Sequence, residues 1–270
     1  MSAAACKRWL AADAPALEQV ELPGGRAVLV LQRSPTRTGD EPCEDAAAVW
    51  SSPTATALVV ADGVGGAPRG HVAAGRVVQA VSAAWSEAAP DGGALRAATM
   101  AAIEDTNQGL LQDGGGSATT VLCAIVAGGE LRTCHAGDSE LLVVGQRGRV
   151  KHRTVSHSPV GYAVESGMLD AGAGLRHEDR HLLSNCVGMA GMRVEVASAI
   201  RLAPFDTVVL ASDGLWDNLT VDEVVEVVRK GPLPAAAERL LALASQRMAQ
   251  ADRRVVGKPD DLSALLFRQR

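Results

Sequence analysis

Acidic residues stand at four places along the chain where an apolar run ends or begins. These places are Glu44-Asp45, Asp62-Gly63, Asp213-Gly214 and Asp260-Asp261. Two of them share one form, an apolar run followed by Asp-Gly, which reads VVADG in one case and LASDG in the other. An Asp at the end of a buried strand is held rigidly, and a Gly after it lets the backbone turn and bring a carbonyl close to a ligand. The pattern therefore places oxygen ligands at strand ends.

Hard cations such as Mg²⁺ and Mn²⁺ prefer carboxylate, carbonyl and water oxygens. Several strand ends that converge would make a binuclear site, in which two ions about 3.5–4 Å apart activate a water and stabilise an in-line displacement at phosphorus. The alternative is that Asp-Gly after a strand is a common turn, and for either motif alone this is the more typical explanation. Composition and spacing leave both interpretations open.

The elements that would position these acids follow from the periodicity of the apolar residues. Strands are expected at 27–31, 46–50, 58–61, 119–126, 131–136, 141–144, 207–211 and 262–267. Helices are expected at 70–89, 94–111, from a capping box of Thr220 and Glu223 to Val228, and from Pro234 to about Ala251. The three strands between 119 and 144 are separated by Gly-containing turns, which predicts a meander.

Strands and helices come in blocks rather than in strict alternation, which favours an α+β layered fold over a doubly wound parallel sheet. The helix at 70–89 is expected to bury Val72, Val78, Val81 and Trp85 on one face. Residues 152–180 have weak periodicity and read as an excursion from the sheet, which leaves open whether they cover the site. No linker or long repeat divides the 270 residues, so one domain over 1–270 is expected.

Composition excludes several classes of function. The net charge of −5 and the aromatic content of 3% argue against a nucleic-acid partner. No run of about 18 apolar residues exists and no signal peptide is evident, so neither a membrane span nor export is expected. The cysteines are odd in number and lack a C-x-x-C pair, which indicates reduced thiols and a cytoplasmic location. They are Cys6, Cys43, Cys123, Cys134 and Cys186.

Taken in order, the motifs resemble those of the metal-dependent protein phosphatases of type 2C, also called PPM, from about Glu44 to Phe267. The matching blocks are Glu44-Asp45-Ala46, VADGVGG at 60–66, GSATT at 116–120, AGDS at 136–139, HSPVGYAVESGM at 157–168, NCVG at 185–188, LASDGLWDN at 210–218 and KPDDLSALL at 258–266. One block would be weak, but this many in the right order make chance agreement improbable.

The resemblance implies an antiparallel β-sandwich flanked by helices on both sides, with Mn²⁺ or Mg²⁺ at one end. It implies a bacterial-type, stand-alone serine/threonine phosphatase in which a metal-bridged water attacks phosphoserine or phosphothreonine. Two ions, with a third in bacterial members, are implied. The implied metal ligands are Glu44, Asp45, Asp62, the Gly63 carbonyl, Asp138, Asp213 and Asp260. Asp62 and Asp213 would act through the metal-bound water, Asp62 by bridging two ions, and Asp138 would serve the third.

Three positions depart from the family pattern. Many members carry a phosphate-binding Arg where this chain has Asp40, so Arg37 is the candidate for that role and Arg33 the fallback. Val64 stands where some members have a His that serves as general acid. Asp261 stands where the family has Asn, which makes its neighbour Asp260 the expected ligand but leaves the choice open.

The implied partners are phosphorylated proteins and, by analogy with the family, a Ser/Thr kinase. Two alternatives stay open, a non-catalytic binding or sensing module of the same fold and a phosphatase of a small metabolite.

Other sequence signals are weaker. Cys43 lies beside carboxylates that would raise its pKa, which disfavours a nucleophilic thiol. The histidines lack zinc-type spacing, and His135, which precedes the AGDS block, is the one candidate for tuning the site.

Overall fold

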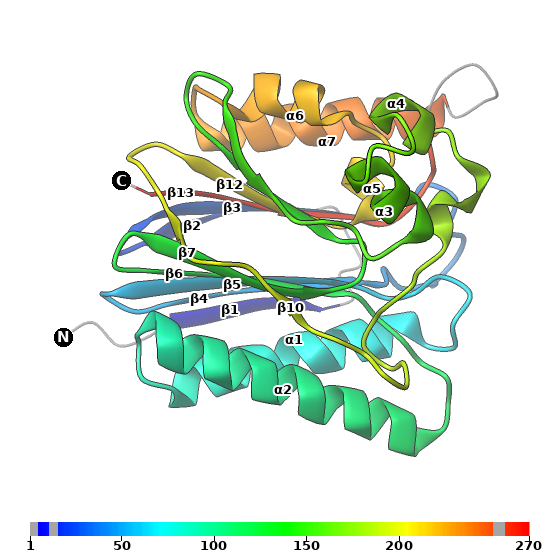
Figure 1. Cartoon of the computed structure of the whole chain (residues 1–270), viewed down its shortest axis with the longest axis horizontal. Coiled ribbons are helices and arrows are strands. Elements are labelled where there is room, and N and C mark those ends of the chain that lie inside the picture. The colour runs from blue at the N-terminus through cyan, green and yellow to red at the C-terminus, as the bar shows by residue number, and fades with distance from the viewer. Residues whose placement is uncertain (1–4, 11–15, 251–256, 270) are drawn as a thin grey trace.

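The chain folds into two antiparallel β-sheets that pack face to face, with helices on both outer faces (Figure 1). The structure is a computed structural model that describes residues 5–10, 16–250 and 257–269. The expected α+β class and the helix-flanked sandwich are confirmed. No helix among these described residues is long and apolar enough to cross a membrane.

The first sheet contains the two Asp-bearing strands that follow each other in the sequence. Its order is β1-β4-β5-β6-β7-β10, and β11 also pairs with β7. The strands are β1 Ala5–Leu10, β4 Asp45–Ser51, β5 Ala55–Asp62, β6 Val121–Ala127, β7 Glu130–Ala136, β10 Glu195–Val196 and β11 Ile200–Arg201. The strands expected at 46–50 and 58–61 lie inside β4 and β5, so both acids stand at strand ends as predicted.

The second sheet has the order β2-β3-β13-β12-β8-β9. Its strands are β2 Ala16–Leu22, β3 Gly25–Gln32, β8 Glu140–Val144, β9 Val150–Arg153, β12 Thr207–Ala211 and β13 Leu262–Gln269. The expected strand at 207–211 is β12 itself. This sheet overturns the predicted meander, because β6 and β7 pair in the first sheet whereas β8 pairs with β12 and β9 in the second. The turn at 137–139 therefore carries the chain from one sheet to the other.

Two helices cover the first sheet and two cover the second. The helices on the first sheet are α1 Gly70–Glu87 and α2 Gly92–Asp113, and those on the second are α6 Val221–Val228 and α7 Leu233–Ala249. The predicted capping box of Thr220 and Glu223 opens α6. The expected end of the last helix near Ala251 lies outside the described residues. Residues 152–180 contain short helices that the sequence did not indicate, α3 Pro159–Glu165, α4 Ala171–Gly174 and a 3-10 helix at Glu178–His181.

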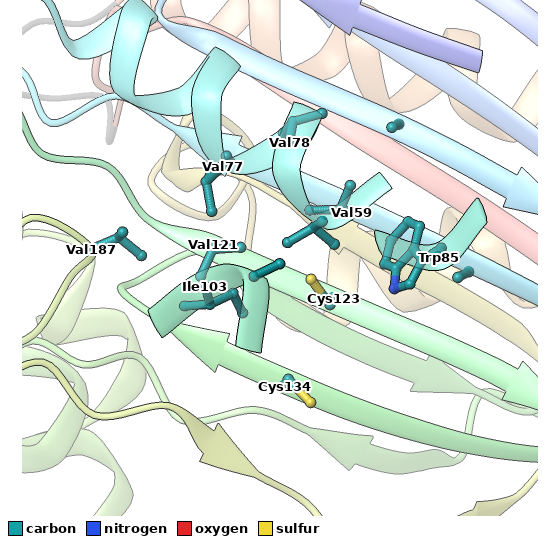
Figure 2. Close-up of a cluster of buried hydrophobic side chains, with 14 of the residues drawn as sticks. Val59, Val77, Val78, Trp85, Ile103, Val121, Cys123, Cys134 and Val187 are labelled. Carbon is teal, nitrogen blue, oxygen red and sulfur yellow. The ribbon is translucent and has the colours of Figure 1, made fainter. Parts of the chain in front are cut away.

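Each central strand is buried on both faces, which explains why these strands read as unbroken apolar runs. On β5, Val59 packs outward against α1 and α2, whereas Leu58 and Val60 pack inward between the sheets. Figure 2 shows the outer layer, in which Trp85 of α1 and Ile103 of α2 meet the sheet. The inward faces of the two sheets form a second apolar layer. Carboxylates lie at one end of this layer.

One residue of the predicted helix face is placed wrongly. Val72 is 38% exposed, whereas Val78, Val81 and Trp85 are fully buried as expected. Small residues take the place that Val72 was expected to fill, because Ala73 and Ala74 face the sheet instead. The close approach of α1 to β4 and β5 accounts for this, since both strands present mostly alanines at the contact.

The buried Trp85 anchors α1 to α2, because its Nε1 donates a hydrogen bond of 2.8 Å to Thr99 Oγ1. Trp85→Ala should lower the free energy of unfolding by about 3–5 kcal/mol through the cavity that it leaves. Met168→Ala is the control, since Met168 is 85% exposed and should change stability by less than about 0.5 kcal/mol. Urea unfolding followed by circular dichroism measures both, and equal effects would contradict this packing.

Candidate metal centre

Two aspartates face each other across neighbouring strands at one end of the sandwich. Asp45 is the first residue of β4 and pairs directly with Asp62, the last residue of β5. Both continue the inward-facing positions of their strands, because Ala47 on β4 and Val60 on β5 belong to the layer between the sheets. Directly opposed residues have Cβ atoms about 4.5–5.5 Å apart. The strand register therefore brings two carboxylates together at the end of a buried layer.

The second sheet contributes the next acid. Asp213 follows β12 and begins the short helix α5 Asp213–Trp216. Ser212, the residue before Asp213, connects the two sheets. Its Oγ donates a hydrogen bond to Asp45 Oδ2 at 2.8 Å and accepts one from the Ser263 N–H at 3.0 Å. The Gly after Asp213 is required by close packing, because a Cβ on Gly214 would lie 1.9 Å from the Asp261 carbonyl oxygen. The Gly of this Asp-Gly motif thus allows close packing between the segment of Asp213 and the segment of Asp260 and Asp261.

Asp138 enters from the turn that crosses between the sheets. Its neighbour Ser139 shares a hydrogen bond of 2.7 Å with Thr120 Oγ1, which in turn accepts from the Asp62 N–H at 3.0 Å. Gly137 permits the crossing, because its φ is +124° and a Cβ there would meet the Thr120 side chain at 2.5 Å. The GSATT and AGDS blocks of the sequence therefore support the backbone of one acid and supply another.

Gly63 plays a different part from the turn that Asp-Gly suggested. Its N–H donates to the Glu44 carbonyl at 3.1 Å, and it forms a bridge with Thr119, so the pairing of the strand continues through it. A Cβ on Gly63 would lie 2.4 Å from the backbone of Gly70, the first residue of α1. The Gly is therefore needed for close packing of the helix start and not for a reversal of the chain.

Mutual repulsion and burial dominate the electrostatics of the centre. Burial raises the pKa of Asp62 well above its usual range, and the charges of Asp45, Asp213 and Asp260 raise it further. Burial and neighbouring carboxylates likewise raise the pKa values of Asp45 and Asp138 well above the usual range. Two such charges about 4 Å apart repel by about 4 kcal/mol at an effective dielectric constant of 20. A single hydrogen bond, worth about 1 kcal/mol, cannot offset this repulsion.

Arg37 neutralises one side of the cluster. Its Nη2 lies 2.5 Å from Glu44 Oε2 and 2.8 Å from Asp261 Oδ2, and its Nε donates to both Asp261 oxygens. Burial would lower the pKa of Arg37, but its hydrogen bonds to Asp261 and Glu44 raise it instead. Arg33, the fallback candidate, donates to the carbonyls of Gly39 and Glu41. The structure therefore brings Arg37 and not Arg33 to the acids.

The two adjacent aspartates that the sequence left undecided have different surroundings. Asp261 is 2% exposed, and besides Arg37 it accepts from the N–H groups of Ser34 at 2.6 Å and Glu44 at 2.7 Å. Its carboxylate therefore ties the loop of Arg37 to the start of β4. Asp260 faces the other acids, and burial together with the Asp213 charge raises its pKa to about 6. Asp260 therefore stays the predicted ligand of the two.

Two residues of this centre received no role from the sequence. Lys258 places its ammonium 2.5 Å from Asp213 Oδ2 and 2.8 Å from Asp260 Oδ2. Asp217 lies one helical turn after Asp213, and burial and the Asp213 charge raise its pKa to about 7. Both lie within recognised motifs, and the i, i+4 spacing of Asp213 and Asp217 is a signal that could have placed them on one side of α5.

The donor set fits hard divalent cations. Within the described part of the chain, no Lys, Arg or His forms an ion pair with Asp45, Asp62 or Asp138. Asp45 Oδ1 and Asp213 Oδ1 are buried oxygens without a hydrogen-bond partner among the described residues. Buried unpaired carboxylates cost several kcal/mol each. Oxygen-rich, acidic and inward-facing, the cluster has the ligand chemistry that Mg²⁺ and Mn²⁺ require.

The excursion at 152–180 forms one wall of a cavity beside the acids. The cavity measures about 530 Å³, and Asp138 and Asp213 line it together with residues of α3, α4, α5 and the start of α6. These short helices gather at the same end of the sandwich (Figure 1). The sequence left open whether residues 152–180 cover the site. The structure places this segment beside the acids, as part of the cavity lining.

A second cluster of possible ligands, His135, His157 and Glu195, lies behind the Asp138 turn. The two rings stack with centroids 4.4 Å apart. His157 Nδ1 accepts from the Gly137 N–H at 3.2 Å and from Asn185 Nδ2 at 2.8 Å, and its Nε2 meets Glu195 at 3.2 Å. With both ring nitrogens engaged, His157 supports the turn as a hydrogen-bonded core residue.

The thiol of Cys43 is buried, and burial followed by the charges of Asp45 and Asp261 raises its pKa, as predicted. A thiol that resists deprotonation in this way is a poor nucleophile. The chemistry of this end of the sandwich therefore falls to the carboxylates.

Comparisons with known proteins identify the family. The sequence profile of "Protein phosphatase 2C" matches residues 34–251. The chain is 28% identical over 183 residues to the "Serine/threonine phosphatase stp" of Listeria monocytogenes, which is 64% of this chain and 71% of the relative.

Two solved structures share the fold. The Stp1 phosphatase of Staphylococcus aureus has a TM-score of 0.78 at 23% identity, with 90% of this chain and 94% of that chain covered. The catalytic domain of the phosphatase PstP has a TM-score of 0.67 at 24% identity, with coverages of 90% and 97%. At these identities the likeness shows the fold alone, whereas the profile covers most of the sequence. The chain belongs to the protein phosphatase 2C family.

Proposed function

We propose that this protein is a metal-dependent serine/threonine protein phosphatase that hydrolyses phosphoserine and phosphothreonine in proteins with Mn²⁺ or Mg²⁺. The observation that carries the proposal is the convergence of Asp45 and Asp62, from neighbouring strands of the first sheet, with Asp138 from the crossing turn; none of the three forms an ion pair with a cationic side chain among the described residues. Their shared repulsion needs divalent cations to balance it. Relatives named serine/threonine phosphatases support the choice of substrate.

The proposed ligands form two groups, one for each metal ion, according to their place in the fold. Asp62 lies opposite Asp45 and interacts with the charges of Asp213 and Asp260, so it would serve both ions, together with the Gly63 carbonyl that follows it. Asp213 and Asp260 would hold the first ion, since Asp213 Oδ1 has no hydrogen-bond partner among the described residues. When bound, two such ions activate a water and stabilise an in-line displacement at phosphorus. A PstP structure in complex with 2 manganese ions supports the assignment.

Glu44 and Asp45 would hold the second ion. Asp45 offers its unpartnered Oδ1 while Ser212 holds Oδ2. Glu44 shares its Oε2 with Arg37, so it acts at the edge of the site and leaves Oε1 close to the start of α1. The Ser212 hydroxyl therefore orients one oxygen of Asp45 away from the proposed ion and the other toward it.

Arg37 is the proposed phosphate-binding residue. Among the described residues, acceptors occupy its Nε and Nη2 but none bonds Nη1. Asp261 and Glu44 hold the planar guanidinium at the border of the acids, where it can donate to a phosphate oxygen. Val64 offers no side-chain proton, and its N–H donates to the Ala118 carbonyl. The leaving alkoxide therefore takes its proton from water.

Phosphorylated proteins and a Ser/Thr kinase that phosphorylates them are the proposed partners. The cavity of about 530 Å³ that borders Asp138 and Asp213 gives room for residues next to the phosphorylated side chain. The cytoplasmic location and the single domain expected from the sequence stay predictions.

Release of phosphate from a phosphothreonine peptide tests the proposal. The purified protein should release phosphate with Mn²⁺ and lose activity in EDTA. Asp62→Asn and Asp213→Asn should each lower kcat by at least about a hundredfold, because each removes a negative charge that balances the metal ions. Asp113→Asn is the matched control, since Asp113 is an exposed acid that pairs with Arg76 on the helix surface.

Activity at the wild-type rate in either site variant would contradict the assignment. A folded protein that binds Mn²⁺ but releases no phosphate from peptides would favour the non-catalytic module. Release from small phosphate esters alone would favour a metabolite as substrate.

The role of Arg37 makes a separate prediction. Arg37→Lys keeps the positive charge beside the buried Asp261 but loses the planar fork, so KM for the phosphopeptide should rise about three- to tenfold with a smaller change in kcat. Arg229→Lys on α6 is the control, because its partner Glu226 is exposed and remote from the acids. Steady-state kinetics at saturating Mn²⁺ distinguish the two, and an unchanged KM in Arg37→Lys would restrict Arg37 to a structural ion pair.

A further inference from the structure

A lysine ammonium lies inside the acidic cluster. Lys258 Nζ is 2.5 Å from Asp213 Oδ2, 2.8 Å from Asp260 Oδ2 and 3.4 Å from Asp217 Oδ2. Its side chain is 25% exposed. We call Asp213, Asp217 and Asp260 the lysine corner. Each acid of the corner turns one oxygen toward the same ammonium, which is the arrangement that a bound cation would produce.

The backbone of Lys258 is fixed, so the side chain is aimed at the corner. The buried Asn218 accepts from the Lys258 N–H at 3.0 Å through Oδ1 and donates to the Lys258 carbonyl at 2.9 Å through Nδ2. The same Nδ2 donates to the Gly214 carbonyl at 2.9 Å. Asn218 thereby fastens the segment of Lys258 to α5, which carries two of the three acids.

The three carboxylates explain why an ammonium is stable there, because each lies within ion-pair distance of Lys258 Nζ. Asp138 lies near the corner, because it lines the same cavity as Asp213 and Asp217. The cluster therefore has two cationic sides, one served by Arg37 and one by Lys258, and Arg180 lies 3.5 Å from Asp217 Oδ2 on the side of Lys258.

We propose that Lys258 is a cation built into the chain that takes the place of a third metal ion at the lysine corner, so that the centre holds two Mn²⁺ or Mg²⁺ ions. This inference rests on the proposed metal-dependent function. A lysine has three donors and no acceptor, so it balances charge without ligating an ion. It also occupies Asp213 Oδ2 and leaves Asp213 Oδ1 for the ion shared with Asp62.

Counting bound Mn²⁺ tests the proposal without reference to activity. The metal-free full chain is titrated by isothermal calorimetry, and the count is checked by equilibrium dialysis with elemental analysis. The wild type should bind about two equivalents. Lys258→Gln keeps hydrogen-bonding capacity but removes the charge, so it should bind one further equivalent, whereas Lys258→Arg should bind as many as the wild type.

Lys151→Gln is the matched control. Lys151 forms a comparable pair with the buried Asp206, at 2.5 Å and away from the acids, and its side chain is 27% exposed. Its loss should leave the Mn²⁺ count unchanged. Circular dichroism reports whether each variant is folded, and Lys258→Ser replaces the glutamine variant if that protein does not fold.

A third ion in the wild type would overturn the proposal, whatever the variants do. So would an unchanged or smaller count in folded Lys258→Gln, because the lysine would then position the acids without replacing an ion. Absence of any Mn²⁺ binding to the wild type would overturn the proposed metal centre itself. Two equivalents in the wild type and an equal count in Lys258→Gln would overturn only the role of Lys258.

Discussion

Repulsion between buried carboxylates at one end of the sandwich is the constraint on which the rest of the structure depends. Asp45 and Asp62 oppose each other in one sheet, and the charge of Asp213 from the other sheet adds to the burial that keeps their pKa values high. At a few kcal/mol per pair, this repulsion is comparable to a large part of the free energy of unfolding of a domain. The fold holds the acids in place, and the proposed metal ions would balance their charge.

The elements around the cluster are the means by which the fold withstands this repulsion. Apolar residues on both faces of the central strands supply the burial that fixes each strand end. Ser212 joins the sheets at Asp45, and Asn218 joins α5 to the segment of Lys258. Gly214 lets these segments approach to van der Waals contact. Arg37 and Lys258 neutralise the two sides, which leaves the middle acids for metal ions.

The sequence predicted the parts of the fold that local patterns determine. Buried strands such as β12, the capping box of α6 and the acids at strand ends follow from apolar runs and short motifs. The path of β8 into the other sheet was missed, because the partner of a strand depends on contacts far away in the sequence. For the same reason the ion pairs of Lys258 with Asp213 and Asp217 and of Arg37 with Asp261 could not be predicted, since they join segments more than forty residues apart.

Anomalous diffraction from a crystal soaked in Mn²⁺ tests the central claim most directly, because it locates each ion against the carboxylates. The account predicts two anomalous peaks at the end of the sandwich, both within about 2.5 Å of an oxygen of Asp62, and none at the ammonium of Lys258. No peak within this distance of Asp62 in a well-ordered crystal, or a peak at His135, His157 and Glu195 alone, would contradict it.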